Sequence, residues 1–287
     1  MRLFMSIPPI SLKPGLYVTA TPIGNLGDIT FRAIETMKHA ALILCEDTRQ
    51  TAKLCAAYEI KTPRAPYHDH NAARVRPEII KKLQEGAAVC LVSDAGTPLI
   101  SDPGYKLVRA ARDAGIDVIP IPGPSAAITA LCVAGAPSDQ FFFAGFLPVK
   151  NGAREKALGD LATIHATLIF YETAPRLAAS LAAMAAALGE RRVCVGRELT
   201  KHFEEFREGR LSDLAADYEA AAPKGEVVVI VFPPEKRAAT SNDMERFLKN
   251  ALAEEMSVKQ AAHAAAATLG VKRNDAYAMA LQLKGRK

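Results

Sequence analysis

The chain has 287 residues, 49% of them hydrophobic and 23% charged, which is typical of a folded globular protein and excludes a disordered one. No apolar run has the length that a membrane-spanning helix needs, and the N-terminus, with one Arg and a Pro8–Pro9 pair, is a poor signal peptide. We therefore expect a cytoplasmic protein without a membrane partner, long enough for two domains.

The net charge of +5 belongs to the C-terminal part of the chain. From Lys236 onward there are ten Lys or Arg and five Asp or Glu residues, whereas the preceding part has 26 of each sign. A basic terminal module on a neutral body fits a polyanionic partner, and on charge alone a solvated tail fits equally well.

The five cysteines are odd in number, far apart and mostly within apolar runs. They are residues 45, 55, 90, 132 and 194, and none forms a Cys-x-x-Cys motif. We expect buried free thiols in a reducing compartment, and no zinc site.

In the first half of the chain, short apolar segments alternate with helical patterns. Strands are predicted at residues 15–23, 41–45, 64–67, 87–92 and 116–121. This alternation indicates βαβ units with right-handed crossovers and a mostly parallel sheet. Ligands of such sheets bind beyond the carboxyl ends of the strands, and all five predicted ends carry polar, Gly or Pro residues.

The loop after the first strand, residues 24–28, contains two glycines but lacks the Gly-x-Gly-x-x-Gly spacing of dinucleotide sites. Pro22 removes a backbone donor there, which also disfavours a phosphate cradle. Two interpretations remain: the loop binds an uncharged or cationic group of a ligand, or it is a plain turn.

The fourth segment is the most informative. Its apolar run, residues 89–92, is typical of a strand buried on both faces, and it breaks at once into the acidic turns of residues 93–104, SDAGTPLISDPG. Asp102 is explained by an N-cap of the next helix, with Pro103 at the first helical position. Asp94 lies too far from any helix start for that role, so we predict a ligand-binding loop.

Beyond Pro137 the strand pattern restarts. Strands are predicted at residues 141–146, 166–171, 191–199, 203–211 and 226–232, with an Ala-rich helix at 176–188. The β-branched strands and their close spacing indicate a second α/β domain with antiparallel pairs.

The tail from about Asn242 is predicted to be helical. Ser257 is a suitable N-cap, Gly270 ends that helix, and a second helix starts near residues 272–275, which is the helix-turn-helix outline. Nucleic-acid binding and a small packing or dimerising helical pair are comparable interpretations.

Several of these motifs occur in one order across both α/β domains. They are residues 19–30 (TATPIGNLGDIT), 46–49 (EDTR), 93–104, 122–126 (PGPSA), 171–172 (YE) and 224–226 (KGE). Together they resemble the tetrapyrrole methylase superfamily, whose cofactor lies folded in the cleft between two α/β domains. Within this superfamily, the first three motifs resemble the ribosomal RNA small-subunit methyltransferase I family. The resemblance covers the chain from about Gly15 to the tail.

The resemblance implies an S-adenosylmethionine enzyme that methylates the ribose 2′-hydroxyl of a cytidine in the decoding region of 16S rRNA. The partner it implies is the small ribosomal subunit, and the assembly is a homodimer. The implied fold is two α/β domains of the tetrapyrrole methylase type, the first sheet mostly parallel and the second mixed, plus a helical module. We expect an N-terminal extension (residues 1–14), domains at 15–123 and 124–235, and a basic helical tail (240–287).

Two alternatives stay open. One is a C-methyltransferase acting on a corrinoid or porphyrin precursor, although such relatives usually have Gly-Asp-Pro at the position of residues 93–95 and lack a basic tail. The other is a ligand-sensing helix-turn-helix regulator, which leaves the residues at the strand ends without a role.

By the same resemblance, nine residues surround the cofactor: Pro22, Asp94, Ala95, Thr97, Ser125, Ala126, Tyr171, Leu199 and Gly225. Asp94 is suited to accept hydrogen bonds from ribose hydroxyls or an ammonium group. Tyr171 is interpreted equally well as a core aromatic residue at a strand end.

Methyl transfer to a hydroxyl also requires removal of a proton, for which His70, Asp102 and Asp47 are the candidate catalytic residues, with His70 preferred. The pair His68 and His70 has no evident third ligand, so no metal is predicted. RNA contacts are expected from cations at the cleft rim and in the tail: Arg49, Lys53, His68, Arg74, Lys201, Lys259, Lys272 and Arg273. Many such cations in proteins are only solvated surface charges.

Overall fold

The computed structural model describes residues 11–235, 240–254 and 256–285. Residues 1–10 of the predicted N-terminal extension, and residues 255, 286 and 287 of the predicted tail, lie outside the described residues. The chain divides into two compact units, residues 1–233 and 234–287. In the described part, no helix has the length and apolar character needed to cross a bilayer.

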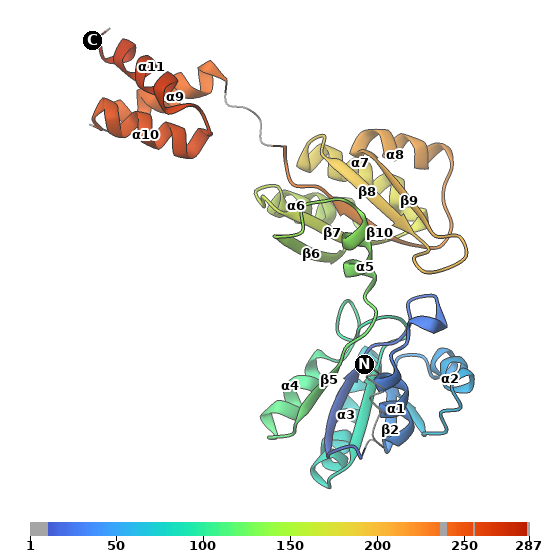
Figure 1. Cartoon of the computed structure of the whole chain (residues 1–287). Coiled ribbons are helices and arrows are strands. Elements are labelled where there is room, and N and C mark those ends of the chain that lie inside the picture. Colours follow the sequence, from blue (N-terminus) through green and yellow to red (C-terminus); the bar gives the residue numbers. More distant parts are fainter. Residues whose placement is uncertain (1–10, 236–239, 255, 286–287) are drawn as a thin grey trace, which may run out of the picture. The chain divides into compact units, whose positions relative to one another are not determined.

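The first sheet is entirely parallel, in the order β3-β2-β4-β1-β5. Figure 1 draws this part of the chain in blue to green, with β2 and β5 labelled. Its strands are β1 (Gly15–Thr19), β2 (Leu42–Cys45), β3 (Arg64–Pro66), β4 (Ala88–Val92) and β5 (Val118–Ile121). Alternate residues of the central strand, β4, pack into different cores. Val89 and Leu91 belong to one core, and Cys90 and Val92 belong to the other. This burial on both faces explains why the strand is continuously apolar, and it confirms the predicted parallel sheet.

Helices follow the strands of this sheet, as predicted. They are α1 (Phe31–His39), α2 (Thr48–Ala57), α3 (Asp69–Gln84) and α4 (Tyr105–Asp113), with a short 3-10 turn at Leu26–Asp28. Thr30 caps α1, because its hydroxyl accepts a hydrogen bond from the backbone N–H of Ala33 at 3.1 Å.

The first strand is shorter than predicted, ending at Thr19 rather than Ile23. Beyond it, Thr21 forms an isolated antiparallel bridge with Gly96, through backbone hydrogen bonds of 2.9 and 3.1 Å. The bridge joins the loop after β1 to the loop after β4, which brings two of the sequence motifs together.

The N-cap predicted for Asp102 is wrong. Helix α4 begins at Tyr105 and its N-cap is Gly104, with a φ of 137° and no side-chain capping bond. A side chain at Gly104 would meet Leu91 and Leu99, so packing in this loop fixes the helix start and leaves the Asp102 carboxylate elsewhere.

The second sheet is mixed, in the order β6-β7-β10-β8-β9, with β6 and β7 parallel and the other pairs antiparallel. Its strands are β6 (Phe141–Phe146), β7 (Thr167–Thr173), β8 (Arg192–Arg197), β9 (Glu205–Arg210) and β10 (Glu226–Val231). The accompanying helices are α5 (Ala126–Val133), α6 (Asn151–Leu161), α7 (Leu177–Leu188) and α8 (Leu211–Ala220), with a 3-10 turn at Ala174–Arg176. The predicted second α/β domain is therefore confirmed.

The two faces of this second sheet have different cores. Residues of α6, α7 and α8 pack on one face, and residues of α5 pack on the other. Ile23, from the loop after β1, joins the core on the α5 side, so the first α/β domain contributes to the packing of the second.

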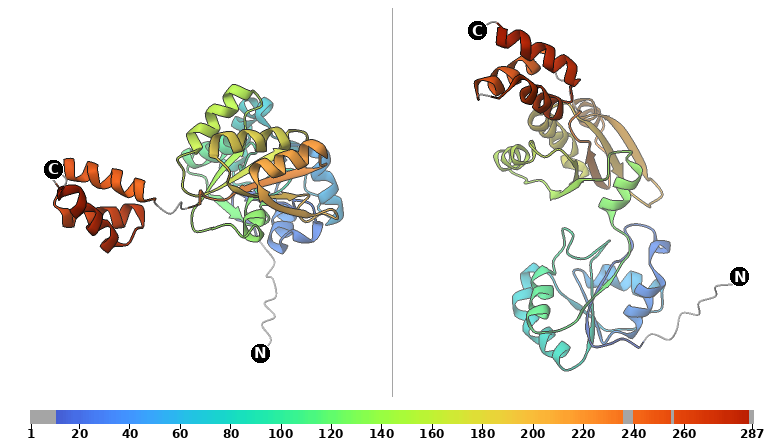
Figure 2. Two further views of the ribbon diagram at one scale, coloured as in Figure 1. Left: turned by 90° about the horizontal axis from the view of Figure 1, so that it is seen from above. Right: turned by 60° about the vertical axis from the view of Figure 1, so that its left-hand side comes forward.

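The tail unit consists of α9 (Ser241–Ala253), α10 (Val258–Leu269) and α11 (Arg273–Gly285), packed against one another (Figure 2). Ser257 caps α10 and Gly270, with a φ of 68°, ends it, as predicted. Its own core is built largely from alanines, which lets the helices approach closely: Leu248, Ala261, Ala262, Ala265, Ala276 and Ala280 are fully buried.

All five cysteines are free thiols, as predicted. Four of them are buried, but Cys132, near the end of α5, is exposed, which corrects the expectation that all are in the core.

Candidate functional site

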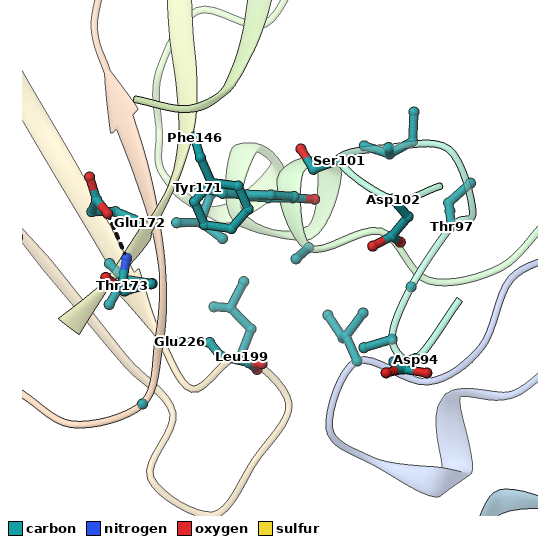
Figure 3. A pocket seen from close by; sticks show the side chains of 18 residues that line it. Asp94, Thr97, Ser101, Asp102, Phe146, Tyr171, Glu172, Thr173, Leu199 and Glu226 are labelled. Atoms are coloured by element: carbon teal, nitrogen blue, oxygen red, sulfur yellow. Dashed lines mark hydrogen bonds between the residues drawn. The ribbon is translucent and has the colours of Figure 1, made fainter. Parts of the chain in front are cut away.

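A cavity of about 340 Å³ lies where the loop after β4 faces the second sheet (Figure 3). One wall is the segment from Asp94 to Asp102, and the opposite wall comes from the ends of β6 and β7 and the start of β10. Ile23, Ala126 and Leu199 complete the lining. The cavity therefore occupies the carboxyl edge of the parallel sheet, where the sequence predicted the ligand.

Local hydrogen bonds hold the loop after β4 in shape. The Ser93 hydroxyl lies 3.0 Å from the carbonyl oxygen of Gly96, to which it donates, and Thr97 Oγ1 donates to the carbonyl of Pro124 at 2.9 Å. Asp94 Oδ1 accepts a bond from the backbone N–H of Asp47 at 3.0 Å. These bonds hold the loop against the segments that follow β2 and β5 of the first sheet, independently of any ligand.

On the opposite wall, Tyr171 is both a core residue and a cavity residue. Its ring packs edge-on against Phe143 and Phe146, with centroids 4.9 and 5.6 Å away, and its hydroxyl accepts a hydrogen bond from the N–H of Ala127 at 3.3 Å. Burial raises the pKa of Tyr171 above its ordinary value. Both interpretations of this residue therefore fit the structure.

The neighbouring Glu172 is buried and fully engaged. It accepts hydrogen bonds from Ser180 Oγ at 2.6 Å and from the N–H of Thr173 at 2.8 Å, and it pairs with Arg176 at 3.3 Å. This network links the end of β7 to α7, so that wall of the cavity is rigid.

Gly225 has a φ of 96°, a conformation that side chains rarely adopt, and a Cβ there would overlap the carboxylate of Glu198. Glu198 in turn accepts bonds from the N–H of Glu226 at 3.0 Å and from Lys201 Nζ at 2.9 Å. Glycine is therefore required where the chain enters β10.

The lining is acidic. Asp94 and Asp102 contribute carboxylates that have no Lys or Arg partner among the described residues, whereas Glu172 and Glu226 are paired with Arg176 and Lys201. None of the described residues that line the cavity is Lys or Arg. A phosphate group is disfavoured there, whereas a cationic ligand is favoured.

Asp102 has the most altered acidity in the cavity. Its pKa is raised to about 6, first by burial and then by the negative charges of Glu46 and Asp94, while the neighbouring Ser93 hydroxyl opposes the change. The pKa of Glu46 is itself raised, first by burial and next by the charge of Asp94. A carboxylate that is ionised at neutral pH and more basic than usual is suited to accept a proton.

Of the three candidate bases, only Asp102 lines the cavity. Asp47 instead accepts bonds from the N–H of Arg49 at 2.8 Å and pairs with its guanidinium, which lowers the pKa of Asp47 to about 2 and makes it a weak base. His70 is exposed in the first turn of α3, 6.0 Å from His68 between ring centroids. No cluster of three potential metal ligands is found in the described part of the chain.

Seven of the nine predicted cofactor residues line the cavity: Asp94, Ala95, Thr97, Ala126, Tyr171, Leu199 and Gly225. Pro22 and Ser125 do not, although each precedes a residue that does. No role was predicted for Phe146, Thr173 or Glu226, although all three stand at strand ends, where a systematic search would have found them.

The predicted rim cations differ in their availability. Lys53 and Arg74 are exposed on α2 and α3, and Arg49 is exposed but paired with Asp47. Lys201 bridges Glu198 and Glu226 at 2.9 and 2.8 Å, so it has a structural role and is less available for the predicted phosphate contact than the exposed cations.

The tail brings two predicted RNA-binding residues together. Lys259 of α10 and Arg273 of α11 line a hollow of about 420 Å³, with Gln260 and His263 beside them. Lys272 is adjacent in sequence, so the turn of the helix-turn-helix carries a cluster of cations.

Comparison with known proteins agrees with this architecture. Residues 15–215 match the family model described as Tetrapyrrole (Corrin/Porphyrin) Methylases, and residues 238–284 match the RsmI C-terminal HTH domain. The solved uroporphyrin-III C-methyltransferase of Thermus thermophilus has a TM-score of 0.55 at 20% identity, covering 76% of this chain and 94% of that one. A solved diphthine synthase has a TM-score of 0.60 at 13% identity, covering 76% and 89%. These structures share the fold.

Curated relatives match nearly the whole chain. A protein of Mesorhizobium japonicum named Ribosomal RNA small subunit methyltransferase I is 52% identical over 97% of this chain and 95% of its own length. A protein of the same name from Escherichia coli O157:H7 is 46% identical over 94% and 96%.

Proposed function

Because the chain belongs to the ribosomal RNA small subunit methyltransferase I family of the tetrapyrrole methylases, we propose that it methylates 16S rRNA with S-adenosylmethionine as donor. We place the methyl group on the ribose 2′-hydroxyl of a cytidine in the decoding region, as the family resemblance implies. The observation that carries the proposal is the cavity between two α/β domains, acidic and without a basic side chain among its described lining residues.

The residues of the cavity fit this cofactor. When bound, S-adenosylmethionine supplies an electrophilic methyl group on a positively charged sulfur, together with an ammonium group and ribose hydroxyls. Asp94 keeps one carboxylate oxygen free to accept hydrogen bonds from such donors. Ala95, Ala126 and Gly225 let the ligand approach the backbone, and the volume lies within the usual range of ligand pockets, roughly 300–1,000 Å³.

Asp102 is the proposed general base. The acceptor hydroxyl must lose its proton as the new bond forms, and a positioned base typically contributes ~10²–10⁴-fold. With its pKa near 6, the Asp102 carboxylate is ionised at neutral pH, and it passes the proton on to solvent afterwards. The rigid walls around it hold the reacting groups in line, an effect worth up to roughly 7–11 kcal/mol.

RNA binding is assigned to cations outside the cavity. Lys53 and Arg74 are exposed near the first sheet, and Lys259, Lys272 and Arg273 cluster in the tail. Contacts of this kind attract phosphates without reading sequence. The target in this proposal is the small ribosomal subunit, and the cell compartment is the cytoplasm.

We also assign a homodimer, on the basis of the family resemblance. The α5 helix leaves Ile128 and Val133 exposed by 44% and 59%, which is compatible with a contact between copies. Light scattering after size-exclusion chromatography tests this, and a monomeric mass would contradict it.

The test of the proposed reaction uses purified protein, labelled S-adenosylmethionine and small ribosomal subunits that lack the modification. Label should enter 16S rRNA, and mass spectrometry of RNase fragments should place it on the ribose of one cytidine. Methylation of uroporphyrinogen III instead would support the tetrapyrrole alternative. Calorimetry without any binding of S-adenosylmethionine would support the regulator.

A further inference from the structure

An irregularity in strand β6 decides which way Phe146 faces. In its pairing with β7, Phe143 is opposite Ile169 and Gly145 is opposite Phe170, so Ala144 is an extra residue in a bulge. In a regular strand, residues three apart point to opposite faces. Here, both Phe143 and Phe146 contact Tyr171 on one face, because the bulge adds one residue between them.

The bulge also places the strand end beside the loop after β4. Gly145 has a φ of 65°, and a Cβ at that position would lie 3.3 Å from Ser101 Oγ. Phe146 therefore lies on the cavity wall next to the segment that carries Asp102 (Figure 3).

Phe146 is too exposed for a core residue. Half of its surface, 50%, is accessible to solvent, although its ring is supported from one side by Tyr171. A large apolar ring that lines a cavity, contacts Tyr171 edge-on and remains half exposed is a suitable surface for a flat ligand group.

The proposed substrate supplies such a group. Proteins that act on single nucleotides of RNA take the base out of its stack and hold it against aromatic side chains. A ribose whose 2′-hydroxyl reaches Asp102 carries its base into the same neighbourhood. The adenine of the cofactor is a second flat group, but the family resemblance assigns the cofactor to other lining residues, among them Ala126 and Leu199.

We propose that Phe146, backed by Tyr171, is the stacking platform for the nucleobase of the acceptor nucleotide. This inference rests on the proposed function and adds to it the residue that positions the target base. Base–aromatic stacking tolerates any base, so Phe146 sets position and not base identity.

The experiment compares three variants whose thermal unfolding midpoints are first checked against the wild type. Phe146→Leu removes the flat face, Phe146→Trp keeps one, and Phe142→Leu is the matched control. Phe142 belongs to the same strand and is 42% exposed, but it pairs opposite Leu168 on the other face of the sheet and does not line the cavity.

We expect Phe146→Leu to lower kcat/KM for the small ribosomal subunit by roughly 10–100-fold, the range typical of one lost stacking contact. Affinity for S-adenosylmethionine, measured by calorimetry, should stay within about twofold of the wild type, because the cofactor is held elsewhere. Phe146→Trp and Phe142→Leu should both stay within about threefold of wild-type activity.

Each other outcome has a defined meaning. Wild-type kcat/KM in Phe146→Leu overturns the platform and leaves the proposed function intact, since the wild type still methylates 16S rRNA. An equal loss of cofactor affinity in Phe146→Leu also overturns it, because the ring then holds the adenine. Failure of the wild type itself to methylate 16S rRNA would overturn the proposed function, and this inference with it.

Discussion

Replacement of Asp102 by Asn is the most direct test of the proposed base. The substitution keeps the size of the side chain and removes its ability to accept a proton. We expect turnover at saturating S-adenosylmethionine to fall by ~10²–10⁴-fold, the usual contribution of a general base. Binding of the cofactor should change little, because Asp94 and the second domain supply most of the cavity wall.

The pH dependence follows from the raised pKa of Asp102. Below about pH 6 the carboxyl group is increasingly protonated, so kcat/KM for RNA should fall about tenfold per pH unit there and level off above. Glu46→Gln removes a negative charge that raises this pKa, so the inflection should move to lower pH. In Asp102→Asn the inflection should disappear.

The same raised pKa predicts that replacing Asp102 with a neutral residue increases the stability of the folded protein at neutral pH. The folded-state pKa, about 6, lies above the ordinary 3.8, so the group's contribution to stability is full below pH 4 and is lost as the pH rises through 6. At about 1.4 kcal/mol per unit, the ionised carboxylate destabilises the fold by up to about 3 kcal/mol at neutral pH. Asp102→Asn should therefore raise the Tm at pH 7.5 relative to the wild type, with the advantage vanishing near pH 4.

Single-turnover methylation of small ribosomal subunits, followed by label incorporation from pH 5 to 9, measures the rate effect. His70→Gln is the control, since His70 does not line the cavity and its variant should keep near-normal turnover. Near-normal turnover in Asp102→Asn, or an unchanged acidic limb of its pH profile, would refute the assignment of the base.

Three further predictions follow from the same structure. Deletion of residues 240–287 should weaken RNA binding and reduce its salt dependence, with cofactor binding retained, because the tail is a compact unit with its own core; an equal salt slope in filter-binding assays would contradict this. Gly225→Ala should weaken S-adenosylmethionine binding at least tenfold in calorimetry, since a Cβ there collides with Glu198; wild-type affinity would count against it. Lys201→Met should lower the Tm by a few degrees, because Glu198 and Glu226 lose their shared cation, while the salt slope of RNA binding stays the same; a reduced slope would restore Lys201 as a phosphate contact.

The sheets and their ligand edge were predictable, because burial on both faces leaves a direct trace in the sequence. The apolar run from Val89 to Val92 marks the central strand, and the acidic turn that follows it marks the ligand edge. The pattern of the second half similarly indicates antiparallel pairs. The errors at strand ends, such as the four residues by which β1 is shorter than predicted, arise where pairing partners such as Gly96 come from distant parts of the chain.

The roles of single side chains were less predictable, because tertiary contacts decide them. Asp102 next to Pro103 has the local features of a helix cap, yet packing of Leu91 and Leu99 places the cap at Gly104. The ion pairing of Lys201 depends on two carboxylates that only the folded chain brings together. The orientation of the last Phe of β6 depends on a bulge, for which the alternation of residues gives no signal.

Backbone strain in the described part of the chain is concentrated around the cavity. Of its five non-glycine residues with positive φ, four lie in two loops that contribute residues to the cavity lining: Leu99, Ser101, Glu198 and Thr200. Each such conformation costs about 1–3 kcal/mol and persists only where surrounding contacts enforce it, as the 2.6 Å bond from the N–H of Thr200 to Glu204 does. Loops without these strained residues would give a more stable protein. Selection for stability alone therefore does not explain why the strained residues lie on both sides of one cavity. Preorganisation of a reaction site does, because strained loops hold opposing groups in place before the substrate arrives.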